Sequence, residues 1–202
     1  MLTLLGLLAM AGIGVAYYFA ARHWLFLAAA SLGLVINWFG DSLDGTLARV
    51  RKIERPKYGY YLDHLVDALG ASFMLFGLAY SGLVSQPLCF AVLTLYLVMS
   101  INVYLATHTL GIFKISYARL STTEGRIFLI ALNIVLIYVK DVQIFEHTVL
   151  ILDIICALAA VFLCILTIRT AVINLDALDR NERGRLDERR NHFKLGRGPF
   201  LE

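Results

Sequence analysis

Six apolar runs divide the chain, and short polar segments separate them. The runs cover residues 2–20, 24–50, 59–83, 88–109, 124–139 and 148–174. Each approaches the roughly 20 residues that an α-helix needs to cross the hydrocarbon core of a bilayer. Pro56 stands between the second and third runs and prevents one continuous helix there. The pattern therefore predicts an all-α integral membrane protein, built as a bundle of six transmembrane helices.

The basic residues predict the orientation of this bundle. With a cytoplasmic N-terminus, every Lys and Arg except Arg22 and Lys140 falls on the cytoplasmic side. Cytoplasmic segments of membrane proteins carry an excess of Lys and Arg, so both termini are predicted to be cytoplasmic. The expected location is a cell inner membrane.

Composition agrees with a membrane location. Of the 202 residues 59% are hydrophobic, against about 45–50% in a soluble domain. The net charge of +3 is small, and no nucleic-acid-binding motif is evident. Cys89, Cys156 and Cys164 lie in apolar runs without metal-ligand spacing, which is typical of buried, inert thiols.

The charge pattern divides the chain into two parts. Residues 1–175 form the predicted membrane domain, and residues 176–202 form a cytoplasmic tail with charges of both signs. The tail is typical of a solvated helix end followed by disordered chain. Attraction to anionic lipid headgroups is a second interpretation, compatible with the first.

Four aspartates lie where the second apolar run ends and the third begins. Asp41 and Asp44 are three residues apart, and Asp63 and Asp67 are four apart. On helices, each pair lies on one face. An ionisable residue in a membrane span is costly to keep and indicates a functional site. Carboxylates that converge need cations, and a hard divalent metal bound through oxygen fits best.

Small and basic residues accompany the aspartates. Gly45, Ala48 and Gly59 let two helices, or a ligand and a backbone, approach closely. Ordinary helix packing explains these small residues equally well when they are taken alone. Arg49 can pair with a carboxylate or hold a phosphate, and the segment 51–57 adds further positive charge. The combination predicts a metal-dependent membrane site for an anionic, phosphorylated substrate.

Eight of these residues stand at fixed spacings: Asp41-x-x-Asp44-Gly45-x-x-Ala48-Arg49, nine residues, then Gly59-x-x-x-Asp63-x-x-x-Asp67. This arrangement resembles the signature of the CDP-alcohol phosphotransferases (CDP-alcohol phosphatidyltransferases). The resemblance extends to a plan of six membrane helices with the signature across the second and third. Residues 2–7 are similar to the family's first helix, which implies that the natural chain begins earlier.

The resemblance implies a reaction and the residues that perform it. An acceptor hydroxyl displaces CMP from a CDP-linked donor and forms a phosphodiester, as in phospholipid biosynthesis. Two Mg²⁺ or Mn²⁺ ions are implied, with Asp67 also acting as the base. The metal ligands are Asp41, Asp44, Asp63 and Asp67. The nucleotide-binding residues are Thr3, Asp44, Gly45, Ala48, Arg49 and Gly59. A homodimer with its active site facing the cytoplasm is expected from the same resemblance.

The substrates stay open at this point. The donor is CDP-diacylglycerol or a CDP-aminoalcohol, and the acceptor is a small polar alcohol or diacylglycerol. The pair Asp63-His64 resembles the choline and ethanolamine branch, and Ala68 argues weakly against the glycerol-phosphate and inositol-phosphate branches. A phosphorylated acceptor would suit three basic residues that are equally well explained as cytoplasmic anchors: Lys114, Arg119 and Arg126.

A transporter or cation channel is the competing interpretation, with the aspartates as an ion path. It explains acidic residues inside membrane helices without any chemistry. It does not explain why the aspartates lie at the cytoplasmic ends of two helices joined by a basic segment. The sequence also shows no inverted repeat of the kind that many transporters contain. The enzyme is therefore the favoured prediction.

Overall fold

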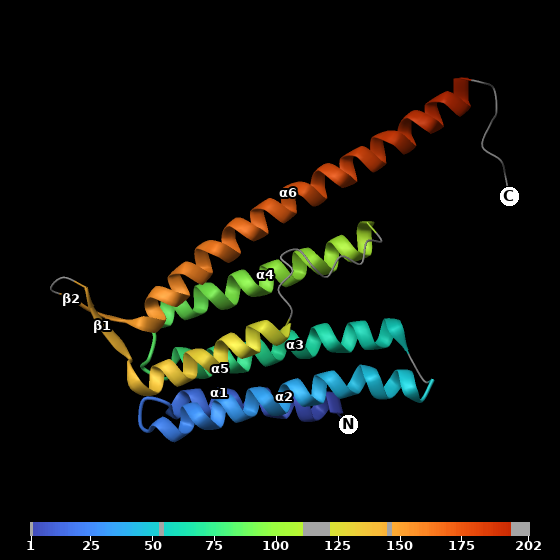
Figure 1. Cartoon of the computed structure of the whole chain (residues 1–202). Helices are drawn as coiled ribbons and strands as arrows, with labels where there is room; N and C mark the ends of the chain where they lie inside the picture. Colours follow the sequence, from blue (N-terminus) through green and yellow to red (C-terminus); the bar gives the residue numbers. More distant parts are fainter. Residues whose placement is uncertain (1, 53–54, 111–121, 145–146, 195–202) are drawn as a thin grey trace.

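The computed structural model describes residues 2–52, 55–110, 122–144 and 147–194. Six α-helices and one β-hairpin make up this part of the chain (Figure 1). The helices are α1 (Leu2–Phe19), α2 (Trp24–Val50), α3 (Pro56–Ala79), α4 (Gln86–Leu110), α5 (Thr122–Tyr138) and α6 (Ile151–Lys194). Strands β1 (Asp141–Ile144) and β2 (His147–Leu150) pair antiparallel between α5 and α6.

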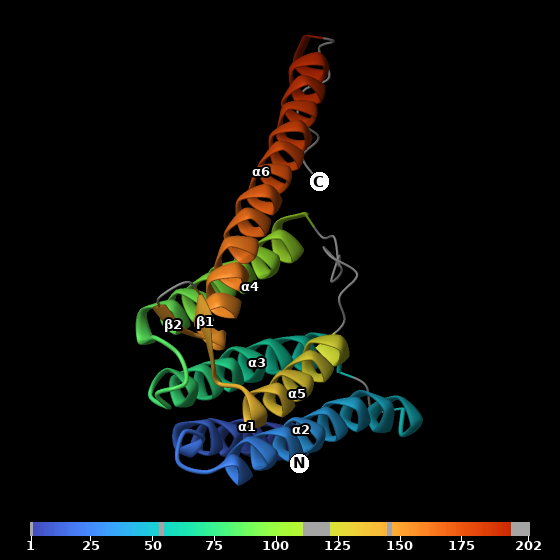
Figure 2. The same cartoon turned by 60° about the vertical axis from the view of Figure 1, so that its left-hand side comes forward.

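Helix α1 makes the main packing contacts of the N-terminal half of the fold. It packs against both α2 and α3, while α5 packs against α2 (Figure 2). Three glycines allow this close packing. A Cβ at Gly77 would overlap the carbonyl oxygen of Gly14, and a Cβ at Gly14 would overlap the carbonyl oxygen of Phe73. A Cβ at Gly33 of α2 would lie 2.5 Å from a side-chain carbon of Ile13. The backbones of α1 and α3 are thus in direct contact.

A buried polar chain joins α1, α2 and α5. The Tyr17 hydroxyl donates to the Asn133 amide oxygen at 2.9 Å, and the Asn133 amide nitrogen donates to the Ser31 hydroxyl at 3.0 Å. Ser31 in turn donates to the carbonyl of Leu27. Buried polar groups are costly unless they are hydrogen-bonded, so this chain favours one register of the three helices.

The second packing unit consists of α4 and α6, and α4 also packs against α3. Asn102 of α4 donates to the Thr170 hydroxyl of α6 at 2.8 Å, and Asn174 donates to Asn102 at 3.4 Å. At the other end, a carboxylate oxygen of Asp153 accepts from the Ser85 backbone N–H at 2.6 Å, directly before α4. Hydrogen bonds therefore hold α6 to α4 at two levels.

The prediction of six helices and an all-α fold is confirmed. Among the described residues, α2, α3, α4 and α6 are long and apolar enough to cross a membrane. Helices α1 and α5 are shorter, with 18 and 17 residues. Figure 1 shows the first turn of α1, the end of α2, the start of α3 and the charged end of α6 at one end of the molecule. Their cytoplasmic orientation, and the count of six spans, stay predictions.

Several helix boundaries differ from the sequence prediction, and at two of them a turn or a strand takes the place of expected helix. Helix α3 ends at Ala79, short of the expected residue 83, because the chain turns through Gly82, whose φ of 80° favours glycine. The last helix begins at Ile151, because residues 147–150 form strand β2 and pair with β1, which the apolar pattern did not predict. Alternation over four residues is too short to distinguish from the start of an apolar helix.

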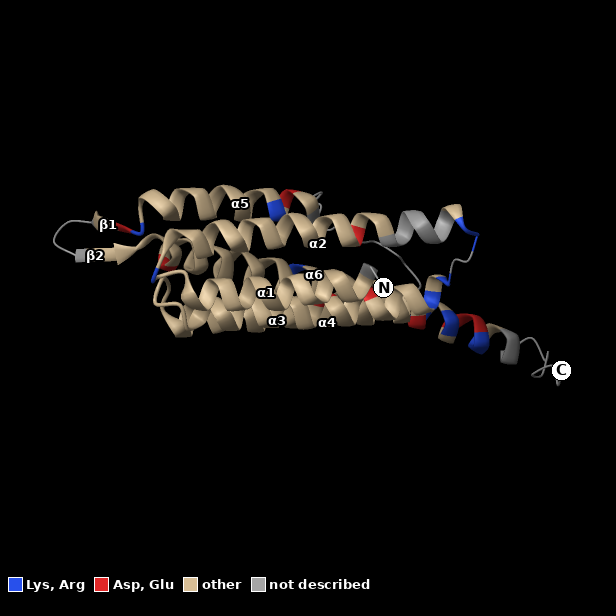
Figure 3. Cartoon of the chain, turned by 90° about the horizontal axis from the view of Figure 1, so that it is seen from below, with Lys and Arg blue, Asp and Glu red and all other residues tan. Residues whose placement is uncertain are grey.

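Helix α6 runs without a break through residue 175 and ends at Lys194. Figure 3 shows its last turns carrying interspersed Lys, Arg, Asp and Glu beyond the bundle, where charged residues are sparse. Two ion pairs at i, i+4 spacing, Arg180–Asp176 and Arg183–Asp179, lie on this exposed part. Such pairs stabilise a solvated helix modestly. The division at residue 175 and the tail's lipid attraction stay predictions.

We expect Gly77→Ala to destabilise the protein by about 1–3 kcal/mol, because the new methyl group must push α1 away from α3. Thermal unfolding of the purified protein in detergent measures this change. The matched control is Gly12→Ala on α1, where a Cβ would meet no atom within 4 Å. Equal stability of the two variants would contradict the close α1–α3 contact.

Candidate active site

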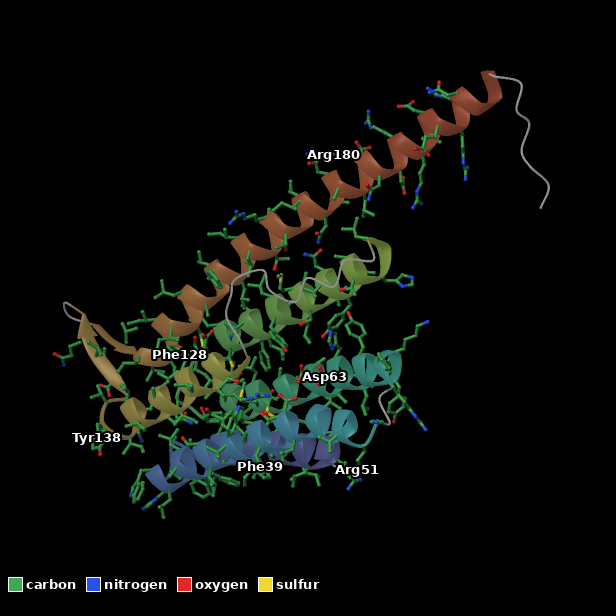
Figure 4. All side chains as sticks on the ribbon, turned by 45° about the vertical axis from the view of Figure 1, so that its right-hand side comes forward. Phe39, Arg51, Asp63, Phe128, Tyr138 and Arg180 are labelled. Carbon is green, nitrogen blue, oxygen red and sulfur yellow. The ribbon has the colours of Figure 1, made fainter. Side chains whose placement is uncertain are left out.

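Three of the four predicted metal-ligating aspartates come together between α2 and α3. Asp41 lies on α2, and Asp63 and Asp67 lie one helical turn apart on α3. The Asp67 carboxylate is close enough to Asp63 and Asp41 to interact with both charges. All three residues are exposed at the protein surface. Figure 4 shows Asp63 on α3, with α2 and α4 on either side.

The arrangement depends on α1. Helices α2 and α3 both pack on α1, through Gly33 and through the Gly14–Gly77 contact. The separation between Asp41 and the α3 carboxylates is therefore set by a helix that carries neither of them. Carboxylates at this spacing repel one another, and packing elsewhere in the fold opposes this repulsion.

Arg126 of α5 supplies positive charge to this cluster. Its Nη2 atom donates to Asp41 Oδ2 at 2.8 Å, and its charge also acts on Asp67. The Arg126 side chain is 14% exposed and the Asp41 side chain 38% exposed. The contact spans 85 residues of sequence and depends on the packing of α5 against α2. Arg126 offsets one of three negative charges, so the cluster retains an excess of carboxylate charge.

The carboxylate oxygens of the three described aspartates are suitable ligands for a divalent metal, although the described side chains do not complete a site. In the part of the chain whose side chains are placed, no group of three or more His, Cys, Asp or Glu could hold an ion. The side chain of Asp44 is not in that part. Exposed carboxylates with uncompensated charge are the ligands that Mg²⁺ and Mn²⁺ prefer, so the chemistry of these side chains suits such an ion.

Aromatic rings surround His64, the residue that follows Asp63. The His64 ring lies 4.0 Å from the Tyr60 ring and 4.6 Å from the Tyr104 ring, centre to centre. His64 Nδ1 is 3.6 Å from Asp63 Oδ2, and the Tyr104 hydroxyl donates to the His64 carbonyl at 3.4 Å. This stack ties α3 to α4 directly beside the carboxylates, which supports the sequence interpretation that His64 is a supporting residue.

Sequence reasoning missed the roles of Tyr60 and Tyr104. Tyr60 stands one turn before His64, so its spacing is a signal that could have been used. Tyr104 carries no local motif. Only the packing of α4 on α3 brings it to His64, forty residues away in the chain.

Of the six predicted nucleotide-binding residues, the structure describes the positions of Gly59 and Thr3 in most detail. Gly59 lies in the first turns of α3, and a Cβ there would meet no atom of the described residues within 4 Å. Protein packing therefore does not explain this glycine. Thr3 lies in the first turn of α1, which packs on α2 and α3. Four predicted residues lie in α2 at positions whose side chains are outside the described part: Asp44, Gly45, Ala48 and Arg49.

Of the three basic residues predicted to bind the acceptor, the structure describes only Arg126. Arg126 is at the carboxylates, as described above. Lys114 and Arg119 lie outside the described residues.

Comparison with known proteins identifies the chain. The model of the CDP-alcohol phosphatidyltransferase family matches residues 1–172, which include every described aspartate of the cluster. None of the curated proteins matches the chain in sequence. The family match confirms the resemblance drawn from the eight spaced residues between Asp41 and Asp67, and it favours an enzyme over an ion path. The chain belongs to the CDP-alcohol phosphatidyltransferase family of membrane enzymes, which release CMP in phospholipid synthesis.

Proposed function

We propose that an acceptor hydroxyl displaces CMP from a CDP-linked donor at the carboxylates of α2 and α3, and that the product is a phosphodiester lipid. The observation that carries the proposal is the exposed group of Asp41, Asp63 and Asp67, held together by α1 and only partly neutralised by Arg126. A buried structural ion pair would be sealed and charge-balanced. This group is open and retains negative charge.

The metal ligands in this proposal are the four aspartates Asp41, Asp44, Asp63 and Asp67. When bound, Mg²⁺ or Mn²⁺ neutralises the diphosphate and polarises the phosphorus under attack, and family membership supports a divalent-metal requirement. Two ions suit four carboxylates. His64 and its aromatic neighbours restrict the movement of α3, and thereby keep Asp63 in place.

Asp67 is the proposed base. It takes the proton from the acceptor hydroxyl as that oxygen bonds to the phosphorus that carries the donor's alcohol. The bond from this phosphorus to the bridging oxygen breaks, and CMP leaves with the electron pair. A carboxylate is a weak base, but a base within hydrogen-bonding distance of the hydroxyl can still contribute about 10²–10⁴-fold to the rate.

The cytidine nucleotide is proposed to lie over the small residues. Gly59 has open space where a side chain would begin, so a nucleotide can approach the backbone of α3 there. Gly45 and Ala48 would leave similar room on α2, with Asp44, Arg49 and Thr3 on the nucleotide side.

The choice of donor and acceptor is the finer part of the proposal. Asp63-His64 favours a CDP-aminoalcohol donor with diacylglycerol as acceptor, and the structure gives His64 a place directly beside Asp63. CDP-diacylglycerol with a small polar alcohol is the other pair, for which Lys114 and Arg119 would hold an acceptor phosphate. We further propose a homodimer in a cell inner membrane, with the site open to the cytoplasm and to the inner leaflet.

Asp67→Asn is expected to lower metal-dependent CMP release by about 10²–10⁴-fold, because the amide cannot accept the hydroxyl proton. The assay uses purified protein in lipid with Mg²⁺ or Mn²⁺, and offers CDP-diacylglycerol with a panel of alcohols, then CDP-choline or CDP-ethanolamine with diacylglycerol. Asp141→Asn, in the exposed β1 strand, is the control and should keep full activity. Unchanged CMP release by Asp67→Asn would refute its role as the base.

Gly59→Ala is expected to weaken CMP binding about tenfold, because the methyl group projects into the space proposed for the nucleotide. Thermal stability should stay the same or rise slightly, because alanine is the better helix former and meets no protein atom there. Calorimetric titration with CMP and a melting curve separate the two effects. A variant that loses stability but binds CMP normally would make Gly59 a packing residue.

A further inference from the structure

The Arg126–Asp41 contact has two features that ordinary surface ion pairs lack. First, Arg126 is mostly covered, with 14% of its side chain exposed, so its guanidinium is largely shielded from solvent. Second, the carboxylate that it binds at 2.8 Å belongs to a group of three, and the charge of Arg126 also reaches Asp67. A guanidinium stays protonated at any physiological pH, so this is a permanent cation inside the proposed metal site.

A permanent cation and a divalent metal compete for the same carboxylates. Oδ2 of Asp41 cannot give its full charge to an ion while it accepts a hydrogen bond from Arg126. The guanidinium and the ion also repel each other at such short range. The long arginine side chain can turn away about its own bonds while α5 stays packed on α2.

We propose that Arg126 is an internal counter-ion: it neutralises Asp41 until a divalent cation binds, and the released guanidinium then binds the diphosphate of the donor. This inference rests on the proposed function. Before the metal binds, the Arg126–Asp41 ion pair reduces the electrostatic repulsion among the three carboxylates. It also sets an order of binding, with the metal first and the anionic nucleotide second, because only the metal frees Arg126.

If Arg126 has this role, removing its charge should change the affinities for Mn²⁺ and for CDP in opposite directions. Arg126→Gln should bind Mn²⁺ about three- to tenfold more tightly, because no internal cation competes. The same variant should bind CDP at saturating Mn²⁺ about three- to tenfold more weakly, because a phosphate ligand is missing. A purely structural role for Arg126 would weaken both, since loss of site geometry cannot improve metal binding.

The experiment uses the full chain in lipid nanodiscs. Free Mn²⁺ is measured by electron paramagnetic resonance during titration, and CDP binding by calorimetry. Arg185→Gln, which removes the same charge from the exposed end of α6, is the control and should change neither affinity. Arg126→Met keeps the bulk of the side chain without its charge and should repeat the result of Arg126→Gln. Arg126→Lys should restore part of the CDP affinity.

The outcomes separate this inference from the proposed function. If the wild-type protein binds Mn²⁺ and both uncharged variants bind it equally or more weakly, the counter-ion role is overturned while the metal site stands. If the wild-type protein binds neither Mn²⁺ nor CDP, the proposed function fails and the inference fails with it. Tighter Mn²⁺ binding together with weaker CDP binding in Arg126→Gln and Arg126→Met supports the exchange.

Discussion

The contact between α1 and α3 at Gly14 and Gly77 is the constraint on which the site depends. Backbone meets backbone there, and neither position has room for a side chain. Because α1 also packs on α2, this contact determines how far Asp41 stands from the carboxylates of α3. Like charges would separate two helices that were free to move. The residues that keep the charges together are thus uncharged and lie on a different level of the bundle.

A membrane protein can maintain such a group of carboxylates only where opposite charges neutralise them or water hydrates them. The aspartates lie toward the ends of α2 and α3 that carry the basic segment, and they are exposed. Arg126 reaches Asp41 from α5, which packs on α2. The site therefore combines fixed positive charge, open carboxylates and an apolar bundle wall. In the function proposed above, a polar nucleotide approaches this arrangement from water and a lipid approaches it from the bilayer.

Much of this was predictable from the sequence because the strongest signals are local. Runs of about twenty apolar residues predict helices, and eight fixed residues between Asp41 and Asp67 predict the chemistry. The paired strands β1 and β2 and the end of α3 at Ala79 were not predicted, since short strands and turns leave little periodicity to detect. The pairing of Arg126 with Asp41 was beyond local reasoning too. It links residues 85 positions apart, and its sequence context is equally typical of a cytoplasmic anchor.

The contrast between local sequence signals and long-range contacts also separates Tyr104 and Arg126 from the signature residues. A signature residue acts through its own chemistry, so its type and spacing are enough to indicate a role. Tyr104 and Arg126 act through what they touch: Tyr104 stacks on His64 beside Asp63, and Arg126 holds Asp41. Their importance follows from α4 packing on α3 and α5 packing on α2. Each of the two helices thereby brings one side chain to the described carboxylates or to the residue beside them, Arg126 to Asp41 and Tyr104 to His64, and neither contact can be read from local spacing.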